Sequence, residues 1–316
     1  MNCPVCNESE TICMRVVYDD RYAYPGEFKV LKCINCAHKF LQHDFTEEEI
    51  GNIYTNYYPR SSLKLETYKP HSASSPFNSW FNGEKSSAYR WVPKNTTILD
   101  IGCGFGESLG YHSERGCDVY GIEADNNIQR VADKFGYKVH AGVFRSELYE
   151  DEFFDYVTMD QVIEHVIDPG KLLRGVAKIL KPGGYLIAST PNVEGWGAGV
   201  FGQRWINWHA PYHLQYFSKN SLEMLAESEG FKLDSAYTIT SSEWLFYQWQ
   251  HLLMYPDIGD PSVFWNKVYQ LSKWKKFLLR LIIKLHKWKM DHLLTRIFDG
   301  IGYGDNKVYI FRKSTD

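Results

Sequence analysis

TTILDIGCGFGESLG, residues 96–110, decides the fold of this 316-residue chain. An apolar run ends at Asp100, and glycine then occupies every second place, at Gly102, Gly104 and Gly106. A strand that turns through glycines into a helix is the usual nucleotide-binding turn of α/β proteins. The dinucleotide pattern G-x-G-x-x-G requires glycine at its sixth place, where this chain has Glu107. The turn therefore predicts a nucleotide site without deciding which nucleotide binds.

Two carboxylates near this turn favour S-adenosylmethionine over a nicotinamide dinucleotide. Asp100 stands at the end of the apolar run, where a carboxylate attracts the α-ammonium group of the methionine half and repels a pyrophosphate. Glu123 ends the next apolar run and is placed to bind both ribose hydroxyls, which fits either nucleotide. A carboxylate that caps the following helix is the structural alternative for Asp100. We expect S-adenosylmethionine.

Strand-like and helix-like segments alternate from Thr96 onward. The apolar segments predict strands over 97–102, 118–125, 138–143, 154–160 and 185–191. The segments between them, several closed by glycine, predict helices over 107–116, 127–136, 161–169 and 170–184. This order predicts an α/β fold with a doubly wound, mostly parallel Rossmann-like sheet, whose ligand site lies at the carboxyl ends of the strands.

The composition divides the chain into five parts. A cysteine-bearing head occupies 1–45, and a polar, aromatic linker with a helical cap occupies 46–94. The nucleotide-binding core is expected over 95–243, a helical insertion (a lid or a membrane-surface element) over 244–300, and the last strand of the core over 301–316.

The head contains two C-x-x-C pairs, formed by Cys3, Cys6, Cys33 and Cys36. Each pair presents two thiolates to one ion, so two pairs complete the tetrahedral shell of a structural zinc ribbon. Buried reduced cysteines are the alternative interpretation, and Cys13, His38 and His43 are weaker candidate ligands. Because four of the seven cysteines stand in these pairs, the pattern is typical of a reducing compartment rather than of a secreted disulfide framework.

A set of five segments carries a family resemblance: ILDIGCGFG, VYGIEAD, FDYVTMDQVIEHVIDP, LKPGGYLIASTPN and HLQYFSKNSLEMLAESEGF. In this order they resemble the successive motifs of class I S-adenosylmethionine-dependent methyltransferases, over residues 96–232. The most similar subgroup includes the ubiquinone-biosynthesis O-methyltransferases and enzymes of sugar and surface-polysaccharide pathways, several of which carry an N-terminal zinc ribbon. The resemblance implies methyl transfer from S-adenosylmethionine beneath a zinc-binding head.

The resemblance also implies a set of donor-binding residues at the strand ends. The glycine turn and the acid before it would bind the methionine moiety. The end of the second strand would bind the ribose, and the end of the fourth strand would form the rim below the transferred methyl group. These residues are Asp100, Gly102, Cys103, Gly104, Gly106, Glu123, Ala124, Asp160 and Gln161. Family members often place an acid after the third strand to bind adenine. This chain has HAGVFRSE there, so we expect the adenine contact from the backbone and Phe144.

A hydroxyl acceptor needs a general base with a pKa near 7, and histidine is the usual one. His209 and His213 stand in NWHAPYHLQYF, on the expected substrate side, with Pro211 between them. His213 is the preferred base because it directly precedes a capped helix start; His209 is second, and histidines satisfied inside an aromatic cluster are the alternative. His165 follows Gln161 where quinone-type relatives have the metal-binding pattern E-x-x-E-H. The missing first Glu predicts no metal there and a packing role for His165.

Residues 263–290, VFWNKVYQLSKWKKFLLRLIIKLHKWKM, carry the densest positive charge. They hold eight Lys or Arg and no acid, in a chain of formal net charge −3. Apolar residues recur at helical spacing, at Phe264, Val268, Leu271, Trp274, Leu278, Leu281, Ile282, Leu285 and Trp288. A basic helix with Trp and Leu opposite is typical of a helix lying in an anionic membrane surface. A lid or dimer helix with a buried stripe is the alternative.

The overall composition narrows the function class. The negative net charge argues against a nucleic-acid partner. No leader and no long apolar run is evident, so we expect a cytoplasmic enzyme, with peripheral contact at the inner membrane face through 263–290 as a further option. The expected acceptor is a small-molecule or lipid-linked saccharide of a cell-surface glycan or polysaccharide pathway. O-methylation of a quinone or other phenol is the alternative, and a non-catalytic binding module with a degenerate fold is the alternative of another class.

Overall fold

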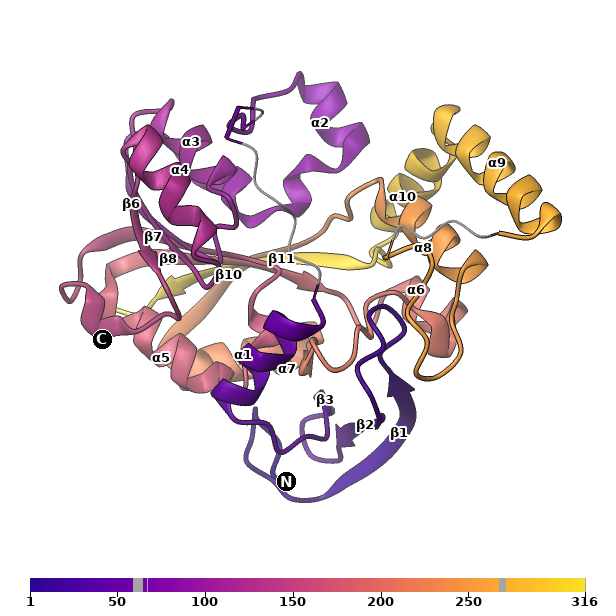
Figure 1. Cartoon of the computed structure of the whole chain (residues 1–316). Helices are drawn as coiled ribbons and strands as arrows, with labels where there is room; N and C mark the ends of the chain where they lie inside the picture. Colours follow the sequence, from indigo (N-terminus) through magenta and orange to yellow (C-terminus); the bar gives the residue numbers. More distant parts are fainter. Residues whose placement is uncertain (59–64, 67, 267–270, 316) are drawn as a thin grey trace.

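A computed structural model describes residues 1–58, 65–66, 68–266 and 271–315 of the chain (Figure 1). Its larger sheet has seven strands in the order β10-β11-β8-β7-β4-β5-β6. The strands are β4 (Thr97–Ile101), β5 (Asp118–Glu123), β6 (Lys138–Ala141), β7 (Phe154–Asp160), β8 (Leu180–Pro191), β10 (Phe231–Thr238) and β11 (Asn306–Lys313). Strands β4 to β8 run parallel, whereas β11 runs antiparallel to both β8 and β10. The α/β class and the mostly parallel sheet are confirmed, and β11 is the expected last strand.

Helices cover both faces of this sheet. Figure 1 shows two of them above it and two below. The upper pair is α3 (Glu107–Ser113) and α4 (Asn127–Phe135), and the lower pair is α5 (Pro169–Ile179) and α7 (Lys219–Ser228). Neighbouring residues of a strand point to opposite faces, so Leu99 packs in the cluster with Val157 and Leu173, while Ile98 packs in the cluster with Leu109 and Val131. Two apolar layers therefore hold the sheet between its helices.

Two sequence predictions are wrong near the end of β7. Residues 161–169 form only a 3₁₀ turn, Ile163–His165, and the helix α5 begins at Pro169. Proline disfavours the helical conformation of the preceding residue, and Asp168 instead caps α5 by accepting a hydrogen bond from the Lys171 amide at 2.8 Å. The segment LKPGG belongs to β8 rather than to the helix before it. The strand β10, which the sequence did not predict, pairs only with β11 and alternates polar and apolar residues.

The cysteine-bearing head forms a second sheet with the core. Its order is β1 (Thr11–Tyr18), β2 (Glu27–Cys33), β3 (Lys39–Leu41) and β9 (Gln215–Tyr216), and β9 comes from the core. Buried His38 crosses the same boundary, with its Nε2 3.0 Å from Oε1 of Gln215 and its Nδ1 3.3 Å from Oγ of Ser221. The hydrogen bonds of His38 explain why it is not needed as a metal ligand. Head and core are therefore joined by backbone pairing as well as by side chains.

The remaining helices lie outside the two sheets. They are α1 (Glu47–Asn56), α2 (Pro76–Asn82), α6 (Trp196–Val200), α8 (Trp244–Leu253), α9 (Lys273–Lys287) and α10 (Met290–Gly300). Further 3₁₀ turns are Glu84–Ser86, Ala88–Trp91, Ser146–Leu148 and Gly202–Arg204. The basic helix is shorter than the predicted 263–290, and Lys267 and Val268 lie outside the described residues. None of the helices in the described part of the chain is both long and apolar enough to cross a membrane.

Candidate functional site

The glycine turn adopts a backbone that favours glycine. Gly102, Gly104 and Gly106 have φ values of 76°, 57° and 80°, a region that other residues rarely enter. A Cβ on Gly102 would stand 2.5 Å from Val162, whereas a Cβ on Gly104 would meet no heavy atom within 4 Å. Gly104 therefore faces open space at the carboxyl end of β4, where a ligand can approach the backbone closely.

Asp100 is buried and engaged inside the fold. Its Oδ1 accepts a hydrogen bond from the Thr158 hydroxyl at 2.7 Å, and its Oδ2 accepts one from the Ser108 hydroxyl. Burial raises the pKa of Asp100 to about 6, although these two hydrogen bonds act in the opposite direction. The side chain thus ties β4 to β7 and to the first turn of α3 through two hydroxyl groups, whereas α3 has no side-chain cap at its N-terminus, so Asp100 is not the helix cap of the structural alternative. Its contact with an ammonium group stays a prediction.

Glu123 lies beside the turn at the end of β5. Its Oε2 accepts a hydrogen bond from the Gly104 amide at 3.0 Å, and its Oε1 accepts one from the Asp125 amide at 2.9 Å. Burial raises the pKa of this carboxyl group. A carboxylate that already reaches the glycine turn is well placed to meet ribose hydroxyls next to it. Ala124 follows and is exposed.

Two other predicted donor contacts pack within the protein. A Cβ on Gly121 would meet the Cys103 sulfur at 2.8 Å, so Cys103 is buried against β5. Phe144 packs against the core, and its ring would lie 3.0 Å from a Cβ on Gly175 of α5. The structure thus gives both residues a packing role, and their contact with the donor stays a prediction.

Asp160 and Gln161 fasten the ends of three strands. Asp160 accepts hydrogen bonds from the Ser189 hydroxyl and, at 3.2 Å, from the Ala88 amide. The amide nitrogen of Gln161 donates to Oγ of Ser189 at 3.0 Å and to Oδ1 of Asn306 at 2.8 Å. These hydrogen bonds hold the ends of β7, β8 and β11 together next to the glycine turn. The rim that the sequence predicts below the methyl group is therefore rigid.

The structure brings the three candidate histidines together. The ring centroids of His165 and His213 lie 4.6 Å apart, and those of His209 and His213 lie 5.0 Å apart. Nδ1 of His213 lies 2.8 Å from the Asn207 carbonyl oxygen, and Nδ1 of His165 lies 2.9 Å from the Tyr212 carbonyl oxygen. Burial, reinforced by the charge of Arg21, lowers the pKa of His209 well below its usual range. Burial likewise lowers the pKa of His165 to about 4 and that of His213 strongly. All three imidazoles are therefore neutral at pH 7.

Four tyrosines surround these imidazoles, and the sequence analysis did not single out three of them, Tyr22, Tyr54 and Tyr58. The ring of Tyr212 stacks on His209 at 4.7 Å, and Tyr22 meets both rings edge-on. The Tyr54 hydroxyl lies 2.7 Å from Nδ1 of His165, and Tyr58 packs against Tyr54. Burial, with the carboxylates of Glu164 and Glu123 nearby, raises the pKa of Tyr54. The sequence signal for these three tyrosines was the density of aromatic residues in YDDRYAYP and IYTNYYP.

The cluster depends on the tip of the β1–β2 hairpin. The Asp19 carboxylate accepts hydrogen bonds from the amides of Arg21, Tyr22 and Tyr24, each at 2.9 Å. The Arg21 guanidinium donates to the Ile206 carbonyl oxygen at 2.5 Å and lies over the Trp265 ring. The hairpin tip of the head thus places Tyr22 against His209 of the core.

A buried carboxyl group borders the histidines. Glu164 accepts a hydrogen bond from the Thr190 hydroxyl at 3.0 Å on one oxygen, while its Oε1 has no partner among the described residues. Burial raises its pKa to about 8. Glu164, His165 and His213 each offer a ligand atom within 4.8 Å of the others, so this donor set is compatible with a divalent cation. The absence of a metal here, which the sequence favours, stays a prediction.

The four head cysteines converge as the spacing predicts. The sulfur atoms of Cys3 and Cys36 lie 3.5 Å apart, as do those of Cys6 and Cys33, and all four lie within 4.8 Å of one another. Sulfur ligands of tetrahedral zinc, each about 2.3 Å from the metal, have similar mutual separations. Cys13 is exposed and lies outside the group. The four thiols therefore fit one structural zinc ion.

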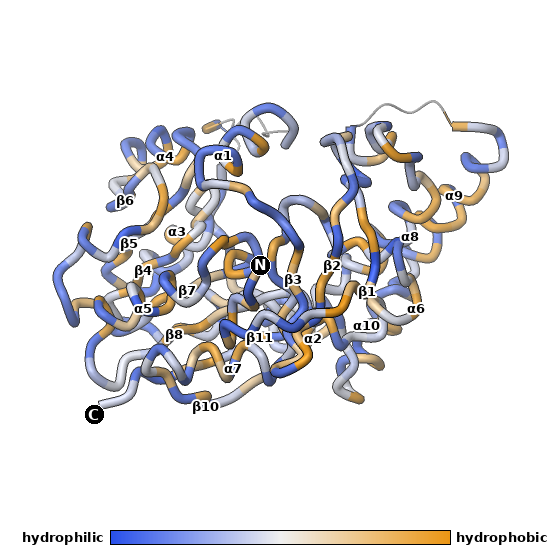
Figure 2. Tube along the Cα trace, turned by 90° about the horizontal axis from the view of Figure 1, so that it is seen from below, coloured by the Kyte–Doolittle hydropathy of each residue, from blue (hydrophilic) through white to orange (hydrophobic). Residues whose placement is uncertain are grey.

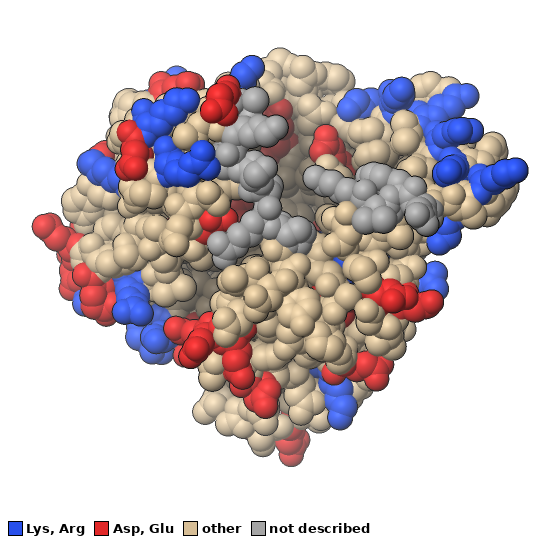
Figure 3. All heavy atoms as spheres, in the orientation of Figure 1, with Lys and Arg blue, Asp and Glu red and all other residues tan. Residues whose placement is uncertain are grey.

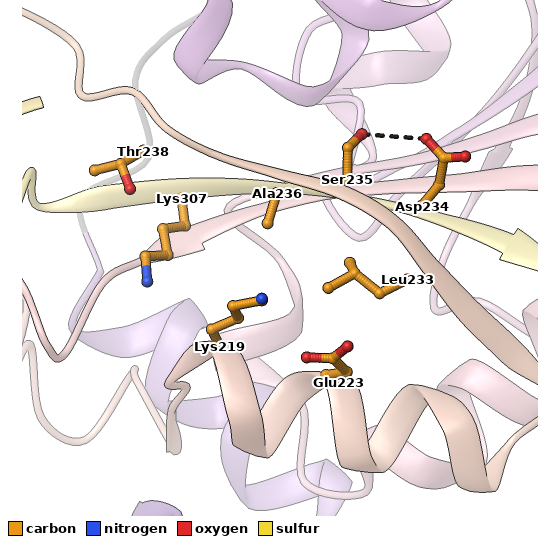
Figure 4. Close-up of a pocket in the computed structure, with 8 residues that line it drawn as sticks. All are labelled: Lys219, Glu223, Leu233, Asp234, Ser235, Ala236, Thr238 and Lys307. Carbon is orange, nitrogen blue, oxygen red and sulfur yellow. Dashed lines mark hydrogen bonds between the residues drawn. The ribbon is translucent and has the colours of Figure 1, made fainter. Parts of the chain in front are cut away.

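The hollow drawn in Figure 4 lies away from these groups. It measures about 420 Å³ and lies between α7 and the strands β10 and β11. The ammonium groups of Lys219 and Lys307 point into it, beside the carboxylate of Glu223. None of the sequence-predicted site residues lines it. Figure 3 shows a separate recess between the part that carries α3 and α4 and the part that carries α9.

Comparisons with known proteins agree with this geometry. Residues 82–236 match the family model described as a methyltransferase domain. The ubiquinone biosynthesis O-methyltransferase of Hydrogenovibrio crunogenus is 33% identical over 107 residues, which cover 31% of this chain and 44% of that protein. The protein of the same name from Nitrobacter winogradskyi is 36% identical over 100 residues, covering 30% and 38%. The chain thus spans less than half the length of these curated relatives.

Solved methyltransferase structures are similar at lower identity. A SAM dependent methyltransferase from Archaeoglobus fulgidus is 20% identical, with a TM-score of 0.46 and coverage of 75% of this chain and 98% of that one. Phosphoethanolamine N-methyltransferase 2 of Haemonchus contortus, in complex with S-adenosyl-L-methionine, is 20% identical, with a TM-score of 0.46 and coverage of 71% and 50%.

The protonation of Glu164 makes a prediction for stability. The unfolded chain loses this proton above the ordinary glutamate pKa, whereas the folded chain keeps it up to a pKa of about 8, so the wild type loses stability as pH rises across that range. Glu164→Gln lacks this loss. We expect its stability advantage over the wild type to grow by on the order of 2 kcal/mol between about pH 5 and pH 8. Denaturant unfolding in metal-free buffer measures it. An advantage that shrinks with rising pH would mean that Glu164 is ionised and paired.

Proposed function

We propose that this chain, whose residues 82–236 match the family model described as a methyltransferase domain, is a class I S-adenosylmethionine-dependent methyltransferase that methylates a hydroxyl-bearing small molecule. The observation that carries the proposal is the open glycine turn at the end of β4, beside a buried cluster of three neutral imidazoles. Bound S-adenosylmethionine supplies a methyl group that its sulfonium already activates. The protein then has to bind and orient the two substrates, exclude water and accept one proton.

The donor side is assigned to the strand ends. The backbone at Gly104 would lie against the methionine half, and Glu123 would accept hydrogen bonds from the ribose hydroxyls. Asp100 holds the first turn of α3 in place and would favour the α-ammonium group by its charge. Asp160 and Gln161 would form the fixed rim below the methyl group. Because these groups sit on strand ends, substrate binding would require little backbone rearrangement there.

His213 is the proposed general base. Its Nδ1 lies against the Asn207 carbonyl oxygen, which can only accept, so Nδ1 carries the proton and Nε2 is left as the acceptor. His209 is the second choice: its Nδ1 is buried without a partner among the described residues, and its backbone has a φ of 36°. Such a backbone is kept only where the surroundings impose it, which is common at functional sites. Burial keeps both rings neutral, so each has a free electron pair, but the lowered pKa also makes them weaker bases than the value near 7 that favours general-base catalysis.

A saccharide hydroxyl is the proposed acceptor, in a cell-surface glycan or sugar pathway. Sugars bind through ring faces and several hydroxyls, and the tyrosine cluster offers both stacking surface and phenolic hydrogen-bonding groups around the histidines. A phenol such as a quinone precursor is the second candidate, favoured by the names of the curated relatives. Incubation with labelled donor and acceptors of both classes, read by mass spectrometry, separates them. A non-catalytic binder would bind S-adenosylhomocysteine or a docking partner without any turnover.

We expect His213→Ala to lower turnover by about 10² or more, because a positioned base contributes a factor of that size. Donor affinity should stay unchanged, since the residue is assigned to the acceptor side. Turnover with the identified acceptor and calorimetry with S-adenosylhomocysteine measure the two effects. His43→Ala, which changes a histidine that stacks on Phe45 and is not one of the three clustered imidazoles, is the control. If His213→Ala has the wild-type turnover, His213 is not the base and only packs within the cluster.

The zinc head is proposed to be structural, because all four positions are filled by protein sulfur. We expect one zinc per chain, lost in Cys33→Ser but kept in Cys13→Ser, whose sulfur is exposed and outside the group. Loss of the ion should lower turnover as well as thermal stability, because the head positions Tyr22 and Arg21. Metal analysis of protein purified without chelator measures the first claim. Zinc-free protein of full stability would overturn it. A second bound metal would point to one of the two other groups of possible ligands, Glu164 with His165 and His213, or Asp291 with His286 and His292.

A further inference from the structure

α9 is a helix without a buried side chain. Its large apolar residues are exposed to a degree that is unusual for core-forming types: 65% for Trp274, 54% for Phe277, 44% for Leu281, and 61% for Trp288, which caps the helix. Figure 2 shows this apolar segment at the edge of the molecule. Exposed aromatic residues that gather on one element mark an interaction surface rather than a random surface composition.

The exposed apolar residues form a stripe that the fold leaves uncovered. Trp274, Phe277, Leu281 and Trp288 follow one another at spacings that keep them on one side of a helix. A different side faces the protein, and its residues are partly buried: Leu278, Leu279, Ile282, Leu285 and His286. Only part of the apolar face that the sequence predicts packs against α8. The rest of that face is exposed.

A basic face adjoins the exposed stripe. Its residues repeat at the same spacings, shifted by one position: Lys273, Lys276, Arg280, Lys284 and Lys287. Figure 3 shows Lys and Arg gathered over α9, with acidic groups concentrated elsewhere on this face of the molecule. None of these five side chains makes an ion pair with a described residue. Their charge is available to an anionic partner.

The end of α9 is firmly attached to its neighbours. Nδ1 of His286 lies 2.6 Å from Oδ2 of Asp291, which is fully buried at the start of α10. The His286 ring also stacks on Phe246 of α8, with centroids 4.1 Å apart. α10, which contacts α9, has exposed apolar residues of its own: Leu293, Ile297 and the C-cap Ile301 are 47%, 52% and 61% exposed and spaced four apart. The contacts of His286 with Asp291 and Phe246 therefore fix the orientation of α9, with its apolar stripe exposed.

We propose that α9 and the outer side of α10 bind the surface of an anionic lipid bilayer. Aromatic and aliphatic side chains enter the boundary between headgroups and acyl chains, while the lysines and the arginine beside them reach the phosphates. A second copy of the chain is the less suitable occupant, because a symmetric contact sets the same patch against itself and brings the two basic faces together. The inference is independent of methyl transfer.

Vesicle co-sedimentation with the full chain tests the proposal. Large vesicles of equal parts phosphatidylglycerol and phosphatidylcholine are compared with pure phosphatidylcholine, at low and at high salt. We expect binding to the anionic vesicles alone, and its loss at high salt. Arg280→Glu with Lys287→Glu should weaken it about tenfold or more. Lys94→Glu with Lys232→Glu, the same change of net charge at two exposed lysines elsewhere, should leave it nearly unchanged.

The apolar stripe has its own variant and control. Trp274→Ser with Leu281→Ser should also abolish sedimentation, whereas Ile12→Ser with Val200→Ser, at apolar residues 51% and 68% exposed elsewhere, should not. All variants should keep the thermal melting temperature of the wild type, since none of the changed side chains is buried. Wild-type protein that stays in solution with anionic vesicles at low salt overturns the proposal. So does light scattering that shows a dimer dissociated by Trp274→Ser with Leu281→Ser.

Discussion

The Asp19 carboxylate organises the half of the site that would face the acceptor. By accepting three backbone amides it fixes the hairpin tip, and the tip in turn places Arg21 against Ile206 and Tyr22 against His209. Burial raises the pKa of Asp19, but the hydrogen bonds it accepts act against that rise. Without this turn the head would still pair with the core through β3 and β9, but Tyr22 would not be fixed beside His209. With it, the head forms a wall of the histidine cluster.

Two sets of contacts fix the position of the head relative to the larger sheet. β3 pairs with β9, so the head is aligned with the backbone immediately after His213. The ends of β7, β8 and β11 are joined by Asp160, Gln161, Ser189 and Asn306. The Leu214 amide also donates a hydrogen bond to the Glu164 carbonyl oxygen at 2.8 Å, so the proposed acceptor side, next to the head sheet, is joined to the turn that follows β7 in the larger sheet. A methyl transfer that depends on alignment over a few ångströms would benefit from such coupling.

The parts of this structure that could be predicted from sequence are those with local signals. The three glycines predict the left-handed backbone of the turn, and the two C-x-x-C pairs predict that four sulfur atoms lie together. The 3₁₀ turn at Ile163–His165 was missed because VIEHVI has apolar residues at helical spacing, while Pro169 decides where the helix starts. Tyr22, Tyr54 and Tyr58 were missed because their meeting with His209 and Tyr212 depends on how the head docks, which no local pattern encodes.

The central claim is that the glycine turn binds the methyl donor, and calorimetry with S-adenosylhomocysteine tests it most directly. The wild type should bind, and Gly104→Val should not, because its side chain would occupy the space the ligand needs. Gly136→Val is a matched control: Gly136 also has a positive φ, 75°, and open surroundings, but it ends α4 away from the turn. Binding by the wild type and Gly136→Val alone supports the account. Equal binding by Gly104→Val, or none by the wild type, contradicts it.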